Sequence, residues 1–160
     1  MTSTRDRIAA RIHADPGIHV NALVRDLDLA PGQVQYHLRR LDVVGDEQFG
    51  RTHYYPPGYD AWDRAALALL RRETAADIVA VLLDAGPLTA TETADRVGIA
   101  ASTLSWHRGR LAEAGLLASE DGRLVVPEPE RTAELLDRAD PSIPERLVDR
   151  FTRLVDDLLD

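Results

Sequence analysis

The stretch "VQYHLRRL" at residues 34–41 returns in outline seventy positions later, as "LSWHRGRL" at residues 104–111. In the first copy, Val34, Leu38 and Leu41 follow the i, i+4, i+7 spacing of an amphipathic helix. Glutamine, tyrosine, histidine and two arginines fill the positions between them. Such a helix packs by one face and presents a polar, arginine-bearing face to solvent or to a partner.

A shift of 70 residues aligns the two halves of the chain without a gap. Apolar residues coincide along the alignment, the pair "YH" at 36–37 coincides with "WH" at 106–107, and Gly45 coincides with Gly115. An ordered set of this kind predicts two copies of one structural unit.

Each copy predicts the same order of elements. A first helix spans about 4–14 or 75–85, a short helix spans 20–27 or 90–97, and a tight turn leads into the third helix. Pro31 suits the first position of one third helix, Ser102 can cap the other, and Thr89 with Glu92 forms a capping box before the short helix of copy two. A hairpin follows, with Gly50 at its tip in "EQFGRTHYY" and Asp121-Gly122 in "ASEDGRLVV".

This element order is that of the winged helix-turn-helix. The sequence therefore predicts a mainly α chain with small β-hairpin wings. Residues 1–58 form the first winged helix-turn-helix unit, 59–72 a linker helix, 73–127 the second unit, and 128–160 an acidic C-terminal helical segment. Two apolar stripes, one on the linker helix and one on the last helix, predict a homodimer interface formed by Trp62, Leu67, Leu70, Leu147, Phe151, Leu154 and Leu158.

The charged residues are unusual in type and in their distribution along the chain. Net charge is −8 over 160 residues, and all 19 basic residues are arginine, with no lysine. Residues 128–160 hold five arginines and ten acids, whereas residues 1–60 hold seven and eight. Acidity of this kind argues against nucleic-acid binding in general. An Asp-rich, lysine-free composition resembles that of proteins from extreme halophiles, where acidity is a solubility trait of the whole proteome.

Composition also excludes several kinds of site. The absence of cysteine excludes disulfides, thiolate metal sites and a cysteine nucleophile. The N-terminus has no apolar signal segment, and no apolar run approaches the roughly 18 residues of a membrane span. The sequence therefore predicts a cytoplasmic protein without a membrane association.

The polar face of the third helix suggests its partner. On a helical wheel, Tyr36 and Arg39 point away from Val34, and Gln35 lies to one side. Arginine recognises guanine and glutamine recognises adenine by paired hydrogen bonds in the major groove of DNA. The helix is therefore interpreted as a recognition helix, against the alternative of an ordinary solvated face.

The two stretches at 34–41 and 104–111 resemble the recognition-helix motif of archaeal winged-helix regulators related to the ArsR and MarR families, of the type common in halophiles. The resemblance covers about residues 5–127. It implies a sequence-specific transcription regulator that binds double-stranded DNA, and it implies that Gln33, Gln35, Tyr36, Arg39, Ser102, Ser105 and Trp106 face DNA. With their neighbours, the predicted DNA-binding residues are Gln33, Gln35, Tyr36, His37, Arg39, Arg40, Arg51, His53, Ser102, Ser105, Trp106 and Arg110.

Copy two departs from the pattern. Arg108 replaces the apolar residue of the stripe, Gly109 follows it, and Glu120 with Asp121 makes its wing acidic. A glycine inside a helix costs about 1 kcal/mol, so this helix is expected to be less regular or to serve an interface. Copy one, with Arg51 and His53 beside Gly50, is therefore predicted to be the stronger DNA contact.

Other functions stay open on the sequence alone. Tyr36 and Trp106 suit packing against a neighbouring element as well as contact with DNA. A tandem winged-helix scaffold of the chromosome-partition type and an architectural DNA-binding protein of low specificity are the alternatives to a regulator. No catalytic signature, cofactor motif or metal-ligand spacing is apparent, and the sequence does not identify an effector ligand or an operator.

Overall fold

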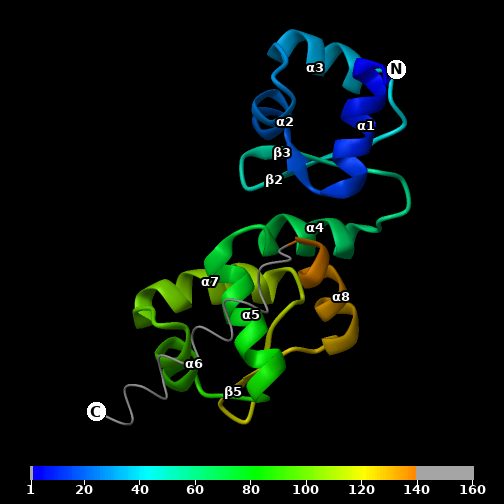
Figure 1. Ribbon diagram of the computed structural model, residues 1–160. Coiled ribbons are helices and arrows are strands. Elements are labelled where there is room, and N and C mark those ends of the chain that lie inside the picture. The colour runs from blue at the N-terminus through cyan, green and yellow to red at the C-terminus, as the bar shows by residue number, and fades with distance from the viewer. Residues whose placement is uncertain (1, 140–160) are drawn as a thin grey trace. The chain divides into compact units, whose positions relative to one another are not determined.

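The computed structural model describes residues 2–139; residue 1 and residues 140–160 are not described. The predicted apolar stripe of Leu147, Phe151, Leu154 and Leu158 therefore lies outside the described residues. The chain divides into two compact units, Met1–Ala68 and Leu69–Asp160 (Figure 1). Within residues 2–139, no helix combines the length and the apolar composition that a membrane span requires.

Unit 1 has the predicted order of helices followed by a hairpin. Its elements are α1 (Thr4–Ala14), β1 (Ile18–His19), α2 (Val20–Leu27), α3 (Pro31–Leu38), β2 (Val44–Gln48), β3 (Arg51–Tyr55) and α4 (Ala61–Leu70), of which the last begins in this unit. The bounds of α1 and α2 are those expected from the sequence. The helix expected over 59–72 is shorter by two residues at each end.

The wing of unit 1 is part of a three-stranded antiparallel sheet with the order β1-β3-β2. Strand β1 was not predicted. It forms because Gly17, at φ +95°, turns the chain after α1 and donates its N–H to the carbonyl of Tyr54 at 2.8 Å. Ile18 then pairs with Tyr54, so the wing is attached to the start of α2.

The core of unit 1 fills the space between its first three helices. Ile8 and Ile12, Leu23, and Val34 and Leu38 come from α1, α2 and α3 in turn, and each is at most 7% exposed. The i, i+4 spacing of Val34 and Leu38 buries one stripe of α3 and leaves its other sides outward. The helix-turn-helix geometry follows from this packing.

Unit 2 repeats the arrangement. Its elements are α5 (Glu73–Ala85), α6 (Ala90–Val97), α7 (Ala101–Glu113), β4 (Ala118–Glu120), β5 (Arg123–Val125) and α8 (Pro129–Ala139). Leu88 forms an isolated bridge with Leu124, at the place where unit 1 has β1. The Thr89 hydroxyl accepts the N–H of Glu92 at 3.2 Å, which is one half of the predicted capping box.

The turn before the third helix is the same in both units. Asp28 ends α2 at φ +53° and Gly98 ends α6 at φ +81°, and both positions are left-handed. Glycine and aspartate are among the residues that tolerate this conformation. Two winged helix-turn-helix units in tandem, mainly α with small hairpin wings, are therefore present.

The expected N-cap of α7 and its expected irregularity were wrong, and the alternative that α7 serves an interface stays a prediction. Ala100, not Ser102, is the N-cap residue, and Ser102 lies inside the first turn of the helix. Gly109 does not interrupt α7, which runs for 13 residues. Leu104 and Leu111 are buried on its inner side, and this packing outweighs the low helix propensity of one glycine.

Candidate nucleic-acid interface

Helix α3 presents a short polar surface. Gln35 is exposed, and Arg39 is exposed at the C-cap, because the helix ends at Leu38, sooner than the sequence suggested. The side chains of Gln35 and Arg39 make no hydrogen bond or ion pair with another residue among 2–139. Both are therefore available for a partner molecule.

Two other predicted contacts on α3 are used inside the protein. The Gln33 side-chain oxygen accepts the N–H of Ala30 at 3.1 Å and so caps the helix. Arg40 lies in the turn after α3, where it donates to the carbonyl of Tyr36 at 3.1 Å. For Gln33 or Arg40 to contact DNA, its hydrogen bond within the protein must break or lengthen.

Tyr36 lies on the outer side of α3 and is 44% exposed. The guanidinium of Arg40 stands over its ring, 3.7 Å from the centroid. The ring of His37 meets it edge-on at 5.2 Å, and Arg5 donates to Nδ1 of His37 at 3.5 Å. The exposed tyrosine is thus held in place by an arginine on one face and a histidine at its edge.

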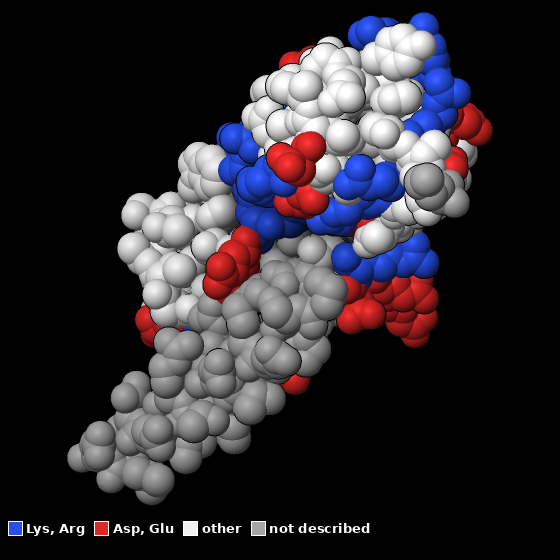
Figure 2. All heavy atoms as spheres, turned by 45° about the horizontal axis from the view of Figure 1, so that its top comes forward, with Lys and Arg blue, Asp and Glu red and all other residues white. Residues whose placement is uncertain are grey.

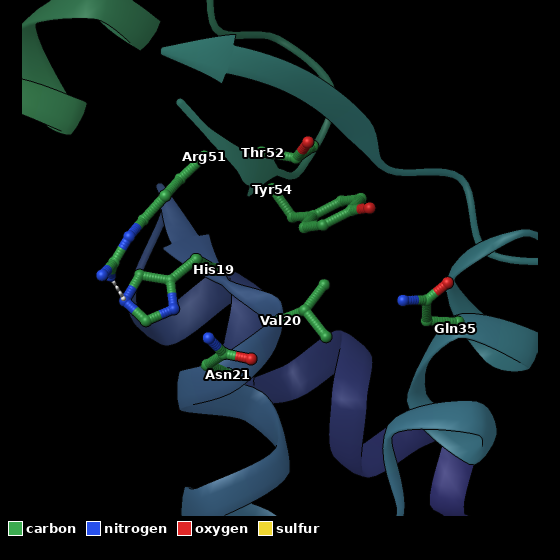
Figure 3. A pocket seen from close by; sticks show the side chains of 7 residues that line it. All are labelled: His19, Val20, Asn21, Gln35, Arg51, Thr52 and Tyr54. Atoms are coloured by element: carbon green, nitrogen blue, oxygen red, sulfur yellow. Dashed lines mark hydrogen bonds between the residues drawn. The ribbon is translucent and has the colours of Figure 1, made fainter. Parts of the chain in front are cut away.

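A cleft of about 340 Å³ separates the wing from α3. Figure 3 shows the side chains that line it, from β1, from the start of α2, from α3 and from β3. They are His19, Val20, Asn21, Gln35, Arg51, Thr52 and Tyr54. None of the seven is acidic, and five carry nitrogen or hydroxyl donors at their ends in addition to the histidine ring.

Arg51 stands at the mouth of this cleft beside His19. Its guanidinium lies 3.2 Å from Nε2 of His19, while Nδ1 of His19 accepts the N–H of Ala22 at 3.3 Å and caps α2 (Figure 3). A neutral imidazole has one acceptor nitrogen, so His19 cannot accept both hydrogen bonds at once. While His19 caps the helix, Arg51 is not fixed by it and can turn toward an anion.

The prediction that His53 contacts DNA was wrong. His53 is 7% exposed, and its Nδ1 donates to the carbonyl of Gly17 at 2.6 Å. The cause is the register of β3: His53 alternates with the exposed Thr52, faces the interior and pairs with His19 of β1. It connects the wing to the turn before α2, which is a structural role.

Several arginines of unit 1 are committed to acids. Arg11 bonds Asp26 at 2.8 Å and also lies 3.5 Å from Asp15. The hydrogen bond from Arg11, supported by Arg25, lowers the pKa of the Asp26 carboxyl. Figure 2 shows arginine side chains in several groups with acidic side chains between them and broad uncharged areas beside them. Any DNA contact therefore depends on particular side chains rather than on a uniformly basic surface.

Helix α7 of unit 2 presents a different surface. Ser102 and Ser105 are exposed, and Trp106 is 48% exposed. The guanidiniums of Arg110 and Arg72 lie 4.1 Å and 5.7 Å from the centroid of the Trp106 ring. Of the predicted contacts, Arg110 lies over the exposed Trp106 ring together with Arg72, and Ser102 and Ser105 are exposed on the same helix.

His107 lies beneath this ring, edge-on to Trp106 at 4.7 Å. Burial lowers its pKa, and the positive charges of Arg72 and Arg110 lower it further. Arg108, which replaces the apolar residue of the stripe, donates to the hydroxyl of Ser119 at 2.6 Å. It joins α7 to the first strand of its own wing.

Within the described residues of unit 2, a hollow of about 150 Å³ lies between α6 and α7. Asp95 and Arg108 are among the residues that line it, so its lining includes a carboxylate, unlike the cleft of unit 1. The tip of the unit 2 wing carries the exposed acids Glu120 and Asp121. An acidic tip repels phosphate, so the two wings differ in what they can approach.

For the predicted dimer-interface residues that lie within residues 2–139, the structure corrects the prediction in part. Leu67 and Leu70 are fully buried within the chain, so they cannot form an exposed interface. Trp62 is half-buried. Leu147, Phe151, Leu154 and Leu158 lie outside the described residues. Within residues 2–139, no group of three or more His, Asp or Glu side chains is arranged to hold a metal ion.

Comparisons with known proteins agree with this architecture. A family profile described as an N-terminal HTH domain matches residues 2–67, and another described as a helix-turn-helix domain matches residues 69–120. The chain is 28% identical over 131 residues to an uncharacterised HTH-type transcriptional regulator of the archaeon Methanocaldococcus jannaschii. The match covers 79% of this chain and 33% of that relative, so the chain spans about a third of the relative's length.

Proposed function

We propose that this chain, two helix-turn-helix domains in tandem, is a sequence-specific transcription regulator that binds double-stranded DNA mainly through unit 1. The two domain matches and the relative's name support a DNA-binding regulator. The observation that carries the finer proposal is the cleft between α3 and the wing, which has donors along it and no carboxylate among its seven lining residues.

In this proposal α3 enters the major groove. Gln35 and Arg39 contact base edges, because both are exposed and neither is engaged within the described chain. Glutamine suits adenine and arginine suits guanine. Tyr36, fixed by Arg40, packs against thymine methyls or sugars, which supplies contact area that does not depend on charge.

The cleft then receives the sugar-phosphate backbone between the two grooves. Arg51 and Asn21 donate to phosphate oxygens, and the N-terminal end of α2 adds a favourable dipole. Because His19 already caps α2 through Nδ1, movement of Arg51 to a phosphate loses little inside the protein. Such contacts set the register of the helix but carry no sequence information.

Unit 2 has a lesser part in DNA binding. Its acidic wing opposes close approach to phosphate, although Arg72 and Arg110 beside Trp106 allow a local contact. We also propose a homodimer, since operators with two-fold symmetry favour dimeric regulators. Its interface is assigned to residues 144–160 from their sequence, together with Trp62.

The test begins with selection of duplexes from a random-sequence library by the full-length protein. A regulator enriches a defined motif and binds it at least 10³-fold more tightly than unrelated DNA. Enrichment without a motif supports the architectural alternative, and no enrichment at any salt concentration supports the protein-interaction scaffold. Light scattering of the full chain and of a form lacking 144–160 tests the dimer: the shorter form should be monomeric and bind DNA more weakly.

A further inference from the structure

The hollow between α6 and α7 in unit 2, about 150 Å³ in volume, combines an apolar part with charged groups. Ala94 and Leu104, both buried, form part of its lining. Asp95 from α6 and Arg108 from α7 add one charge of each sign, and Ser105 adds a hydroxyl. Small-molecule sites have this composition, an apolar lining with a few polar groups that orient the ligand.

The repeat explains why unit 2 is hollow at this place. A shift of 70 residues aligns Ala90 with Val20 and Ala94 with Val24. Both valines pack against the core of unit 1. Since valine has two methyl groups more than alanine, each alanine leaves open a space that unit 1 fills. The helix-turn-helix fold therefore does not require this hollow.

Arg108 adds to this difference between the units. Its equivalent in unit 1 is Leu38, which is 7% exposed and belongs to the core. Arg108 instead donates to the hydroxyl of Ser119 at 2.6 Å and lines the hollow. A guanidinium has five N–H donors, so the bond to Ser119 leaves donors for a ligand.

The two charges of the hollow are not used on each other. Asp95, which stands where unit 1 has Arg25, is exposed and makes no hydrogen bond or ion pair with another residue among 2–139. Asp95 and Arg108 line one hollow without forming an ion pair together. A molecule that carries an ammonium group and a carboxylate can pair with both.

We propose that this hollow binds a small zwitterionic amino acid. The ammonium group donates to Asp95, the carboxylate accepts from Arg108, and the short side chain lies against Ala94 and Leu104. A volume of about 150 Å³ equals that of roughly five water molecules in the liquid, so a ligand of the size of alanine fits and an aromatic one does not. The inference goes beyond the proposed function and does not depend on DNA binding.

Other occupants suit the hollow less well. Asp95 repels a nucleic-acid phosphate, and so it opposes the contact that an arginine beside a helix would otherwise favour. A simple anion or a simple cation pairs with one of the two charges and leaves the other in contact with a like charge or with water. A ligand with both charges is therefore the chemical class that the lining fits.

The test uses L-alanine as the probe and the isotopically labelled full-length protein without DNA. In NMR titrations, amide signals of residues 90–108 should shift and saturate with a Kd of roughly 0.1–10 mM, as expected for a ligand of this size. The equivalent residues 20–38 should not respond. Propionate and ethylamine, which each keep one of the two charges of alanine, should bind roughly tenfold more weakly or less.

The decisive variant takes its residues from unit 1. Ala90→Val combined with Ala94→Val should fill the hollow and abolish the binding of L-alanine. Its melting temperature should stay the same or rise, because the equivalent residues of unit 1 are valines in the same fold. The melting curve thus separates a filled site from a misfolded unit.

A second variant tests the charge. Asp95→Asn should reduce the affinity for L-alanine to that for propionate, because only the contact with the ammonium group is lost. Arg25→Asn, at the equivalent position of unit 1, is the matched control and should leave the affinity unchanged.

Three results would overturn the inference. They are no saturable shift at residues 90–108, retained binding by the double valine variant, and equal affinity for L-alanine and either of the singly charged probes. Because the titrations contain no DNA, failure of the protein to bind any duplex would overturn the proposed function and leave this site standing.

Discussion

The two units share their first two helices and differ from the end of the third helix onward. Helix α3 ends at Leu38, whereas α7 continues for five more equivalent positions to Glu113. The residues that follow explain the difference: "LDVVGDEQ" contains β-branched valines and two aspartates, and "LAEAGLLA" contains alanines and a glutamate. Unit 1 therefore has a short helix and a long wing, and unit 2 has a long helix and a short wing.

This difference changes what each unit can touch. The long wing of unit 1 joins β1 and leaves a donor-lined cleft beside α3, while the short wing of unit 2 is joined to α7 by Arg108 and carries acids at its tip. One repeated pattern thus gives a donor-lined cleft in unit 1 and an acidic wing tip in unit 2. The following experiments test whether the division is real.

The largest effect is expected from the core of each unit. Ile8 and Ile78 occupy equivalent positions in the repeat and are both fully buried. Replacing either with alanine should cost about 2–5 kcal/mol of stability in its own unit. Hydrogen exchange followed by mass spectrometry should show Ile8→Ala weakening protection in residues 4–55, and Ile78→Ala weakening it in residues 73–136.

DNA affinity is the matching readout for these two variants. Ile8→Ala should reduce affinity for the selected duplex far more than Ile78→Ala does, because unit 1 holds the proposed interface. If either variant lost hydrogen-exchange protection equally in both units, the two units would unfold together. Equal losses of affinity would remove the functional distinction between them.

The next effect concerns the helix surface. Arg39→Ala and Gln35→Ala should each weaken binding to the selected duplex by about 1–3 kcal/mol and relax the sequence preference at one position. Ser105 of α7 is the counterpart of Gln35 in the repeat, and Ser105→Ala should have a smaller effect. Titration by fluorescence anisotropy measures all three. A larger loss from Ser105→Ala would reverse the assignment of the two units.

The sequence predicted the element order and the helix starts well, because apolar spacing, Pro31 and Asp121-Gly122 are local signals. It failed where the outcome depends on contacts distant in the chain. The end of α3 is set by competition between helix and wing, and the burial of His53 is set by its pairing with β1. The cleft was missed because His19, Asn21 and Thr52 come together only through that same unpredicted strand.

Salt should separate the two units further. Residues 1–60 are nearly balanced in charge, whereas most of the negative charge lies in 128–160. The Debye length falls from about 10 Å at 0.1 M salt to about 3 Å at 1 M, which screens repulsion among carboxylates. Circular dichroism melts in potassium chloride should show the transition of unit 2 rising more than that of unit 1. A melting temperature independent of salt would argue against a halophilic protein and would again count net charge −8 against DNA binding.

The smallest effect concerns His107 of α7. Burial and the charges of Arg72 and Arg110 lower the pKa of His107 below its usual 6.5. The unfolded chain therefore binds a proton more readily than the folded one, so this group's contribution to stability is complete above pH 6.5 and is lost as the pH falls through the folded pKa. His107→Gln should flatten the decline of unfolding free energy below pH 6.5, as followed by urea denaturation.

Arg72→Ala should raise the pKa of His107 in an NMR titration, because it removes a repelling charge and leaves Arg110 to hold the Trp106 ring. If the His107 resonance titrates at or above 6.5 in the wild-type protein, burial and the two arginines do not lower its pKa in this way.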